Sequence, residues 1–389
     1  MKICIDVRCL SEGRRTGVEE YIEGLLKSLF EIDSKNEYIL FLNSWKEPDD
    51  DFSWIKKYSN VKIKKLKIPN KILNFSFWYF NWPKIDVICG GADIVFLPNI
   101  IFAGISSRAK LILTVHDLSY ERYPQYFSWK RRLWHSFVNA KKICQKAQKI
   151  IAISDSTQKD IIELYQIPER KIEKIYSATG EKFRMIDRND PKLVKTKEKY
   201  YLPYKFILFL GTIEPRKNVI GLIEAFEEFQ EKAEIEKNNQ LKKYSLVIAG
   251  SRGWLNEKIF FKIKNSKFSS KIKLINFVDE EDKEYIYNLA SIFVFPSFFE
   301  GFGFPPLEAM KCGVPVIVSS NSSLPEVVGE GAVLVDSERI SDIAVAMKEI
   351  LTDKKFRECL IKKGLIRANY FNWEKTARQT LAFFYKRIF

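Results

Sequence analysis

Short apolar runs alternate with helical or loop sequence along the whole chain. In the first half, the runs that predict buried strands are Lys2–Val7, Tyr38–Leu42, Ile94–Leu97, Leu111–Val115 and Lys149–Ile153. In the second half they are Phe206–Leu210, Leu246–Ala249, Lys273–Phe277, Ile292–Phe295, Val316–Val318 and Val333–Val335. This alternation predicts an α/β fold with parallel sheets and right-handed crossovers.

The pattern also predicts where domains begin and end. Residues 17–30 carry apolar side chains at helical spacing, whereas residues 181–204 are polar, charged and interrupted by two prolines, as in a linker. We therefore expect two Rossmann-like domains, residues 1–185 and 200–370, facing each other across a cleft. The apolar segment Phe371–Phe389 has helical spacing, and we expect it to pack back onto the first domain.

Composition narrows the class of protein. The 389 residues are 46% hydrophobic, enough for two or three domains with real cores. The six cysteines are scattered without a C-x-x-C pair, and the N-terminus does not resemble a secretory signal. We therefore expect reduced thiols and a cytoplasmic location. No apolar run of about 18 residues predicts a transmembrane helix.

The formal net charge of +15 leaves several partners open. Excess cations suit nucleic acid, an anionic membrane or anionic small ligands, and they also suit a solvated, lysine-rich surface without a partner. No zinc spacing or RNA-recognition signature supports nucleic acid, so we expect none. Residues 129–149 interleave seven lysines and arginines with large apolar side chains, as in a helix lying on an anionic membrane. Because helices of Rossmann-like domains need an inward apolar face, we expect this one to pack on its own domain; peripheral contact with the inner face of the membrane is the alternative.

The most informative stretch is residues 296–313, PSFFEGFGFPPLEAMKCG. It follows a predicted strand and places Glu300 and Glu308 with seven residues between them, with glycines at 301 and 303. The prolines at 305 and 306 suit the first turn of a helix. A strand, a glycine loop and a helix N-terminus in this order predict a ligand site that favours an anion.

Another strand end carries two cations. The segment Phe206–Asn218, FILFLGTIEPRKN, places Arg216 and Lys217 just before a helix. Charge-assisted contacts to a phosphate are worth roughly 1.5–3 kcal/mol each, so this segment predicts a phosphate site. The alternative is an exposed basic turn.

Two segments of the first half are further candidates. Residues 111–120, LILTVHDLSY, end a strand with His116, one of two histidines in the chain; it is either structural or a functional group facing the cleft. The loop at residues 13–21 opens a helix, and its backbone at Gly17 and Val18 could approach a phosphate or a sugar closely. It lacks G-x-G-x-x-G, so a dinucleotide site is not supported.

Six segments together carry a family resemblance. They are TVHDLSYERYPQYFS (114–128), AISDSTQKDI (152–161), FLGTIEPRKN (209–218), VIAGSRGW (247–254), EGFGFPPLEAMKCG (300–313) and SSLPEVVGEGAVLVD (322–336). In this order and spacing, they resemble the retaining glycosyltransferases of the GT-B fold and GT4 type, which include bacterial mannosyltransferases of polysaccharide assembly. The spacing of Glu300 and Glu308 is similar to the E-x7-E signature of that family.

The resemblance implies a nucleotide-sugar site in the second domain. Lys217, helped by Arg216, would neutralise the diphosphate, and Glu308 would hydrogen-bond the ribose. The base would lie against the loop that reaches Val278. Preorganised cations stabilise a phosphate leaving group without a metal, so the resemblance implies no metal and no cofactor besides the donor substrate.

The resemblance also implies how the sugar is handled. His116 would approach the donor sugar and the developing charge, while Gly17 would border the diphosphate or the acceptor. The groups implied to hold the sugar are Glu300 and the backbone amides of Phe302, Gly303 and Phe304. The family mechanism is front-face, with the leaving phosphate assisting removal of the acceptor proton. Where many relatives carry an arginine this chain has Thr212, and Arg216 is expected to take that place.

By resemblance, the expected activity is transfer of a sugar from GDP-mannose or a UDP-sugar. The acceptor would be a saccharide or a lipid-linked glycan in cell-surface polysaccharide assembly. The alternative is a nucleotide-sugar 2-epimerase of the same two-domain shape, which consumes one nucleotide-sugar and needs no acceptor.

Overall fold

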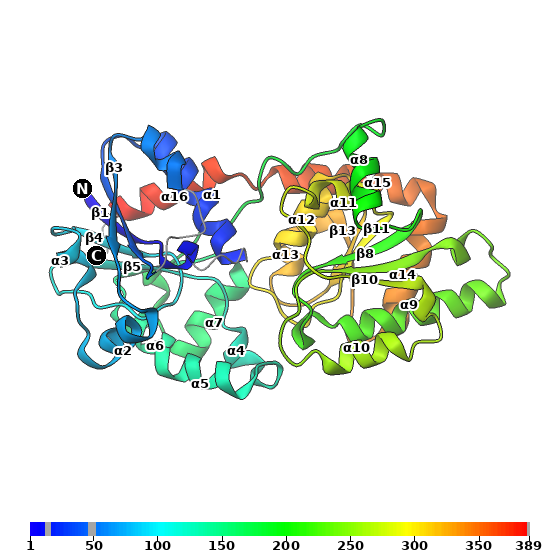
Figure 1. Ribbon diagram of the computed structural model, residues 1–389, viewed down its shortest axis with the longest axis horizontal. Coiled ribbons are helices and arrows are strands. Elements are labelled where there is room, and N and C mark those ends of the chain that lie inside the picture. The colour runs from blue at the N-terminus through cyan, green and yellow to red at the C-terminus, as the bar shows by residue number, and fades with distance from the viewer. Residues whose placement is uncertain (12–16, 46–51, 387–389) are drawn as a thin grey trace. The chain divides into compact units, whose positions relative to one another are not determined.

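The computed structural model describes residues 1–11, 17–45 and 52–386, and the chain divides into two compact units (Figure 1). The first unit is drawn from Met1–Arg122, Trp129–Ala178 and Asn372–Phe389. The second is drawn from Tyr123–Ser128 and Thr179–Phe371. The short segment 123–128 therefore belongs to the second unit, although the sequence on both sides of it belongs to the first.

Within the described residues, the first unit contains a sheet of seven parallel strands in the order β3-β2-β1-β4-β5-β6-β7. The strands are β1 (Lys2–Asp6), β2 (Glu37–Asn43), β3 (Val61–Leu66), β4 (Ile94–Leu97), β5 (Lys110–Val115), β6 (Lys149–Ala152) and β7 (Ile172–Lys174). The helices are α1 (Gly17–Ile32), α2 (Asn70–Phe80), α3 (Ile85–Ile88), α4 (Ser119–Arg122), α5 (Trp129–Val138), α6 (Ala140–Lys146), α7 (Asp155–Tyr165) and α16 (Trp373–Tyr385).

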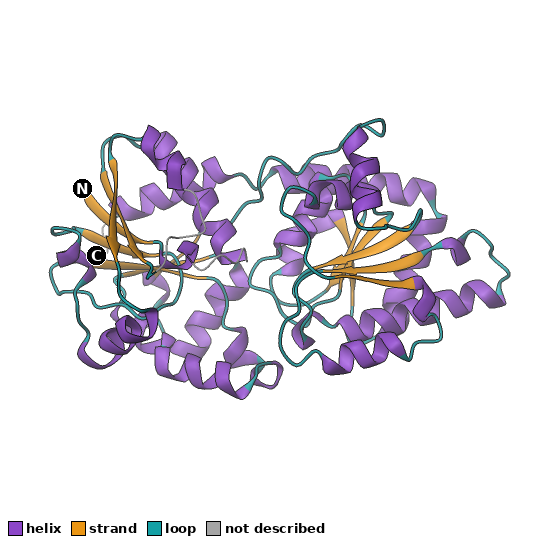
Figure 2. Cartoon of the chain, in the orientation of Figure 1, coloured by secondary structure: helices purple, strands orange, loops and turns teal. Residues whose placement is uncertain are grey.

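The described part of the second unit contains six parallel strands in the order β10-β9-β8-β11-β12-β13. The strands are β8 (Phe206–Leu210), β9 (Ser245–Ala249), β10 (Ile272–Ile275), β11 (Ile292–Phe295), β12 (Val316–Ser319) and β13 (Ala332–Val335). The helices are α8 (Pro191–Lys199), α9 (Val219–Ile235), α10 (Glu257–Lys264), α11 (Lys283–Leu289), α12 (Phe304–Lys311), α13 (Leu324–Val328), α14 (Ile340–Thr352) and α15 (Lys354–Asn369). Helices cover the strands of each unit (Figure 2), so central strands such as β8 and β11 are buried along their whole length.

Each sheet has one point at which the strand order reverses. In the second unit, β8 lies between β9 and β11, and in the first unit β1 lies between β2 and β4. Crossovers on the two sides of such a point run in opposite directions, which leaves a crevice at the carboxyl ends of the strands. Lys217 follows β8 and Glu300 follows β11, so both lie at the reversal point of the second sheet.

The predicted α/β fold is confirmed. Every predicted strand is present, with ends displaced by at most two residues. The prediction omitted β3, an edge strand whose lysines face solvent, and β7, which has three residues. The segment 181–204, expected to be a linker, instead contains α8, which belongs to the second unit.

The C-terminal helix α16 packs on α1 of the first unit. Gly24 allows this close approach, because a Cβ there would lie 2.2 Å from the indole of Trp373. Farther along α16, Thr376 Oγ1 donates a hydrogen bond to the carbonyl of Tyr176 at 2.8 Å. The ring of Phe384 meets that of Phe96 on β4 edge-to-face, with centroids 5.3 Å apart. Residues from the end of the sequence thus complete the first unit.

The expectation for residues 129–149 was wrong in two respects. The segment is two helices, α5 and α6, separated by Asn139 in the left-handed conformation with φ of 51°. The apolar face of α5 packs on its own domain only in part: the rings of Trp134 and Phe137 contact Phe102 and Trp78, but the large apolar side chains of α5 stay 44–69% exposed, and Val138 is the buried residue of this helix. In the described ranges, no helix combines the length and apolar content needed to span a bilayer.

Candidate functional site

The chain places Arg216 and Lys217 by a short turn between β8 and α9. Pro215 begins a 3-10 turn at Pro215–Lys217, and Asn218 then adopts a left-handed conformation with φ of 53°. The Asn218 side chain caps α9 by accepting a hydrogen bond from the amide of Gly221 at 3.2 Å. Both cations therefore lie immediately before a helix N-terminus, where backbone N–H groups and the helix dipole also favour an anion.

The loop that carries Glu300 is held by two serines at the start of α13. The amide of Glu300 donates to Ser322 Oγ at 2.9 Å, and Ser323 Oγ lies 2.8 Å from the carbonyl oxygens of both Glu300 and Phe302. Gly303 caps α12 with φ of 118°, and a Cβ there would lie 2.9 Å from Leu324 Cδ2. The glycine is thus required by both backbone conformation and space.

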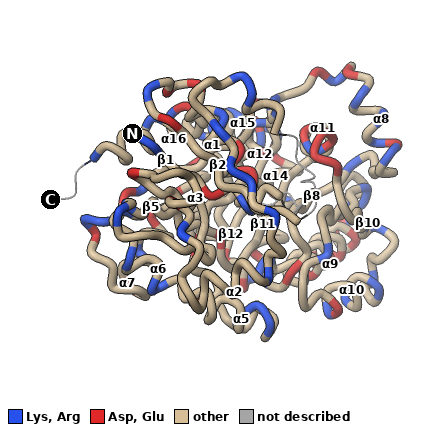
Figure 3. The backbone as a smooth tube through the Cα atoms, turned by 60° about the vertical axis from the view of Figure 1, so that its left-hand side comes forward, with Lys and Arg blue, Asp and Glu red and all other residues tan. Residues whose placement is uncertain are grey.

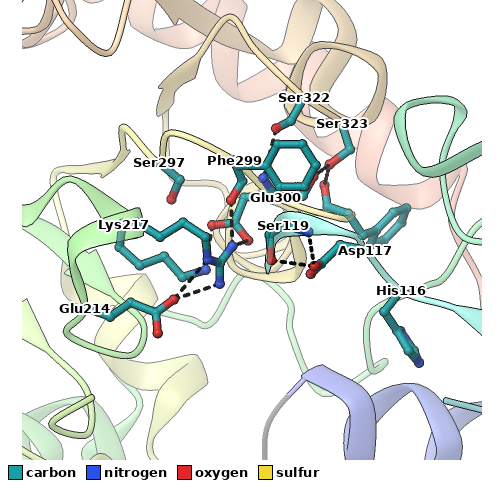
Figure 4. Close-up of polar contacts among 12 residues, drawn as sticks. His116, Asp117, Ser119, Glu214, Lys217, Ser297, Phe299, Glu300, Ser322 and Ser323 are labelled. Carbon is teal, nitrogen blue, oxygen red and sulfur yellow. Dashed lines mark hydrogen bonds and ion pairs between the residues drawn. The ribbon is translucent and has the colours of Figure 1, made fainter. Parts of the chain in front are cut away.

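Lys217 and Glu300 form a buried ion pair (Figure 4), with Nζ 2.5 Å from Oε1. Arg216 also approaches this carboxylate, with Nη1 3.3 Å from Oε2. Its guanidinium donates to the carbonyl of Phe299 at 2.6 Å and to Glu214 at 2.8 Å. The two loops are joined through the backbone as well, because the Phe298 amide donates to the Arg216 carbonyl at 2.9 Å. Two cations therefore converge on one carboxylate.

The environment shifts the pKa of both partners. Burial raises the pKa of Glu300, but the charges of Lys217 and Arg216 outweigh burial and leave that pKa below its usual value. Burial, with a smaller effect of Arg216, lowers the pKa of Lys217 despite the opposing effect of Glu300. A carboxylate held ionised between two cations is the expected state at neutral pH.

Glu308 occupies a different environment on the buried side of α12. Its carboxylate accepts a hydrogen bond from the Tyr287 hydroxyl at 2.7 Å. Burial raises the pKa of Glu308, although Lys283 and the Tyr287 hydrogen bond oppose the shift. The two glutamates of the E-x7-E spacing therefore differ in charge environment: Glu300 is paired with cations, whereas Glu308 is held by a neutral hydroxyl.

The remaining candidates of the second unit are less closely grouped. The side chain of Phe302 is buried and meets the rings of Phe304 and Phe371 edge-to-face, at centroid distances of 5.3 and 5.6 Å. Because this ring is packed against two other aromatic rings, we assign any ligand contact of Phe302 to its backbone. Val278 is buried in the loop after β10, and β9 separates β10 from β8 in the sheet.

In the first unit, the structure brings the helix that begins at Gly17 to His116. Tyr21, one turn into α1, meets the His116 ring edge-to-face with centroids 4.8 Å apart. His116 Nε2 lies 2.8 Å from the Pro98 carbonyl. Because a carbonyl oxygen only accepts, Nε2 carries the proton and Nδ1 is the acceptor of the neutral ring. Burial lowers the pKa of His116, so the imidazole is neutral near pH 7.

Several residues that support the site were not singled out in the sequence. Ser322 and Ser323 position the Glu300 loop, Glu214 orients Arg216, and Tyr287 binds Glu308. Ser322, Ser323 and Glu214 lie inside the segments that carry the family resemblance, and this position could have identified them from the sequence. Tyr287 lies in none of these segments. Across the described ranges, no three His, Cys, Asp or Glu side chains gather as a metal site would require.

Two family descriptions match the chain. Residues 15–179 match "Glycosyltransferase Family 4", and residues 192–366 match "Glycosyl transferases group 1". The first match ends at residue 179, at which the second unit resumes.

Two relatives from Escherichia coli are similar in sequence. The O-antigen chain mannosyltransferase B is 32% identical over 273 residues, which cover 70% of this chain and 69% of the relative. The serotype-specific mannosyltransferase WbdA is 34% identical over 270 residues, which cover 69% of this chain and 32% of the relative. The alignment thus spans about a third of WbdA.

Among solved structures, sucrose-phosphate synthase from Thermosynechococcus elongatus superimposes with a TM-score of 0.74. The sequences are 19% identical, and the superposition covers 99% of this chain and 98% of that one. At this identity, the likeness shows a shared fold.

Proposed function

The chain belongs to the GT-B glycosyltransferases of the group 1, GT4 type, and from this premise we propose that it transfers mannose from GDP-mannose with retention of configuration. The proposed acceptor is a saccharide or a lipid-linked glycan of a cell-surface polysaccharide. The two mannosyltransferases among its relatives support the choice of sugar. We propose a cytoplasmic enzyme that meets its acceptor at the inner face of the membrane.

The convergence of Lys217 and Arg216 on Glu300 is the observation that carries this proposal. A donor diphosphate supplies anionic oxygens that can replace the Glu300 carboxylate as partner of both cations. The freed carboxylate can then accept hydrogen bonds from hydroxyls of the transferred sugar. Because buried charges require a partner, this exchange keeps every charge paired while the donor binds.

The other candidates have complementary roles in the proposal. Glu308 accepts hydrogen bonds from the ribose hydroxyls, and the backbone amides from Phe302 to Phe304 contact the sugar. The base lies against the loop at Val278, and Gly17 borders the diphosphate or the acceptor. His116, neutral and with Nδ1 as acceptor, receives a hydrogen bond from a sugar hydroxyl.

The proposed chemistry places the cations where charge develops. As the glycosyl–phosphate bond breaks, negative charge grows on the leaving diphosphate, and Lys217 and Arg216 stabilise it. The sugar becomes oxocarbenium-like, and the leaving phosphate takes the proton of the acceptor hydroxyl on the same face. We propose no metal and no further cofactor for this step, because two fixed cations already face the diphosphate.

A 2-epimerase of the same fold is the second function. Two observations disfavour it: the matches to glycosyltransferase families cover both units, and the two relatives from Escherichia coli are transferases by description. A nucleic-acid partner has only the net charge in its favour.

Calorimetric titration with GDP-mannose, UDP-glucose and ADP-glucose tests the donor site, with Glu308→Ala as the comparison. We expect binding of one nucleotide class by the wild-type protein and its loss in the variant. Equal binding by both proteins would remove Glu308 from the site. Once the bound donor is identified, the anomeric configuration of the product, read from its NMR coupling constant, reports whether transfer retains or inverts configuration. Epimerisation of a UDP-sugar in the absence of an acceptor would instead identify an epimerase.

A further inference from the structure

Helix α2 of the first unit exposes an unusual number of aromatic side chains. It buries Leu73 and Phe77, which lie four residues apart and therefore on one face. The large apolar residues around the rest of the helix and just after it are 47–67% exposed: Ile72, Phe75, Trp78, Tyr79, Phe80 and Trp82. One buried stripe is enough to attach the helix to its domain, so these aromatics are not needed for the core.

The exposed face of α5 continues the same surface. The rings of Trp78 and Phe137 meet edge-to-face with centroids 5.4 Å apart, which joins α2 to α5. The two helices also lie side by side in both views of the chain (Figures 1 and 3). The exposed large apolar residues of α5, at 44–69%, are Trp129, Leu133, Trp134 and Phe137. We name the ten residues of α2, its C-terminal flank and α5 the aromatic surface.

The charged residues on the three helices α2, α5 and α6 have one sign. None of α2, α5 and α6 contains an aspartate or a glutamate. The exposed cations on these helices include Lys71, Lys130, Arg132, Lys141 and Lys142. In Figure 3, α5 accordingly carries a continuous stretch of basic residues. On these three helices, exposed cations thus accompany the apolar aromatic centre and no acid does.

We propose that the aromatic surface docks the first unit onto an anionic lipid bilayer, with the α2 aromatics in the interfacial region and the lysines and arginines of α5 and α6 at the phosphate groups. Trp, Tyr and Phe favour this region because their rings are apolar and polarisable, and cations beside them are attracted to anionic headgroups. Ring contacts join Phe75, Tyr79 and Phe80 to one another and, through Trp78, to α5, and joined exposed apolar side chains of this kind mark interaction sites. The inference deepens the proposed function and rests on its location at the membrane face, but it is independent of which donor the protein uses.

The same charges argue against a second copy of the chain as the occupant. Self-association through this surface would bring the basic borders of two copies together, and such like-charge contacts are unfavourable. An anionic bilayer offers phosphate groups to the cations and an interfacial region to the aromatic side chains, so both parts of the surface gain a partner.

Vesicle co-sedimentation tests the proposal directly. The probes are vesicles of phosphatidylglycerol and phosphatidylethanolamine, compared with phosphatidylcholine alone. We expect the wild-type protein to bind the anionic vesicles, and to bind them less as salt rises. Phe75→Ser/Tyr79→Ser should lower the partition coefficient by at least about tenfold, because two rings leave the interface. Lys130→Gln/Arg132→Gln should lower binding by about tenfold and weaken the salt dependence.

A matched control is available in the second unit. Ile235 and Phe261 are 80% and 70% exposed, so Ile235→Ser/Phe261→Ser removes as much exposed apolar surface elsewhere and should leave binding unchanged. Thermal unfolding verifies that each variant is folded.

Failure of the wild-type protein to bind anionic vesicles, or equal binding by the aromatic variant, would overturn the proposal. A dimer that dissociates in the aromatic variant without any change in vesicle binding would assign the surface to a second copy instead. Donor titration, which uses no lipid, separates these outcomes from failure of the transferase assignment.

Discussion

Lys217 Nζ lies 2.5 Å from Glu300 Oε1, although 83 positions separate the two residues. Their proximity follows from the strand order, because β8 and β11 are neighbours in a parallel sheet and their carboxyl ends share an edge. Each residue is a buried charge whose counter-charge is supplied by the other loop. The pair therefore has a structural role and, in our proposal, a second role when a diphosphate replaces the carboxylate.

Lys217→Met should weaken donor binding by about 10- to 100-fold, since a charge-assisted contact to phosphate is worth roughly 1.5–3 kcal/mol. The variant should also be less stable by about 3 kcal/mol, because Glu300 is left buried without its main counter-charge. Calorimetry and chemical denaturation measure the two effects.

The double variant Lys217→Met/Glu300→Gln separates these roles. Removing both charges should recover most of the lost stability but none of the donor affinity. Recovery of both would mean that Lys217 acts only through folding.

Glu308→Gln should lower nucleotide affinity by about tenfold with little loss of stability, since the amide is isosteric and burial already raises the pKa of this carboxyl. Tyr287→Phe is the companion variant, because it removes the hydroxyl that holds Glu308 while keeping the carboxylate. We expect a smaller loss of affinity for Tyr287→Phe. A larger loss for Tyr287→Phe than for Glu308→Gln would contradict the assigned role.

His116→Ala should reduce turnover by about 10- to 100-fold while changing donor affinity less than threefold, if its Nδ1 contacts the sugar chiefly as the bond breaks. His116→Asn, which retains a polar side chain, should recover part of the rate. Steady-state kinetics with the donor identified by calorimetry provide the comparison. A loss confined to donor affinity would place His116 in ground-state binding.

Gly303→Ala should destabilise the second unit by about 2–3 kcal/mol and weaken donor binding, because the added Cβ meets Leu324 in a left-handed backbone conformation. Gly313→Ala is the matched control: φ is also positive, at 69°, but the three atoms nearest to the added Cβ all belong to the flexible, exposed side chain of Met185. Gly313→Ala should lower the free energy of unfolding by about 1 kcal/mol and leave donor affinity unchanged. An equal loss of donor affinity in Gly303→Ala and Gly313→Ala would mean that the loop at Gly303 has no specific role in donor binding.

The first unit should lose stability as the pH falls from about 7 to 4. Burial lowers the pKa of His135 from 6.5 to about 4, although the negative charge of Asp117 opposes this shift by stabilising the protonated ring. Within this interval the unfolded chain binds a proton that the folded chain does not, so protonation favours unfolding. His135→Phe, which keeps an aromatic ring on Tyr120, should reduce this pH-dependent loss by about 2 kcal/mol after allowing for solvent screening. Parallel slopes of stability against pH for both proteins would contradict the assignment.

Local pattern was sufficient to predict most elements. Buried runs such as Phe206–Leu210 and Ile292–Phe295 are strands with the predicted bounds, because a strand covered on both faces is apolar throughout. The edge strand Val61–Leu66 was missed because its lysines face water and it lacks that apolar signal. The candidates Arg216, Lys217 and Glu300 were recognisable because each follows a strand in a motif of characteristic spacing.

The sequence by itself determined that cations and carboxylates stand at strand ends, since strand and helix periodicity is a local property. Only the tertiary structure decided that Lys217 meets Glu300, that Glu308 is held by Tyr287, and that the apolar face of α5 remains exposed beside α2. Those outcomes depend on which strands are neighbours and which faces other elements cover. Contacts between residues far apart in the chain set both, and periodicity within one segment does not encode them.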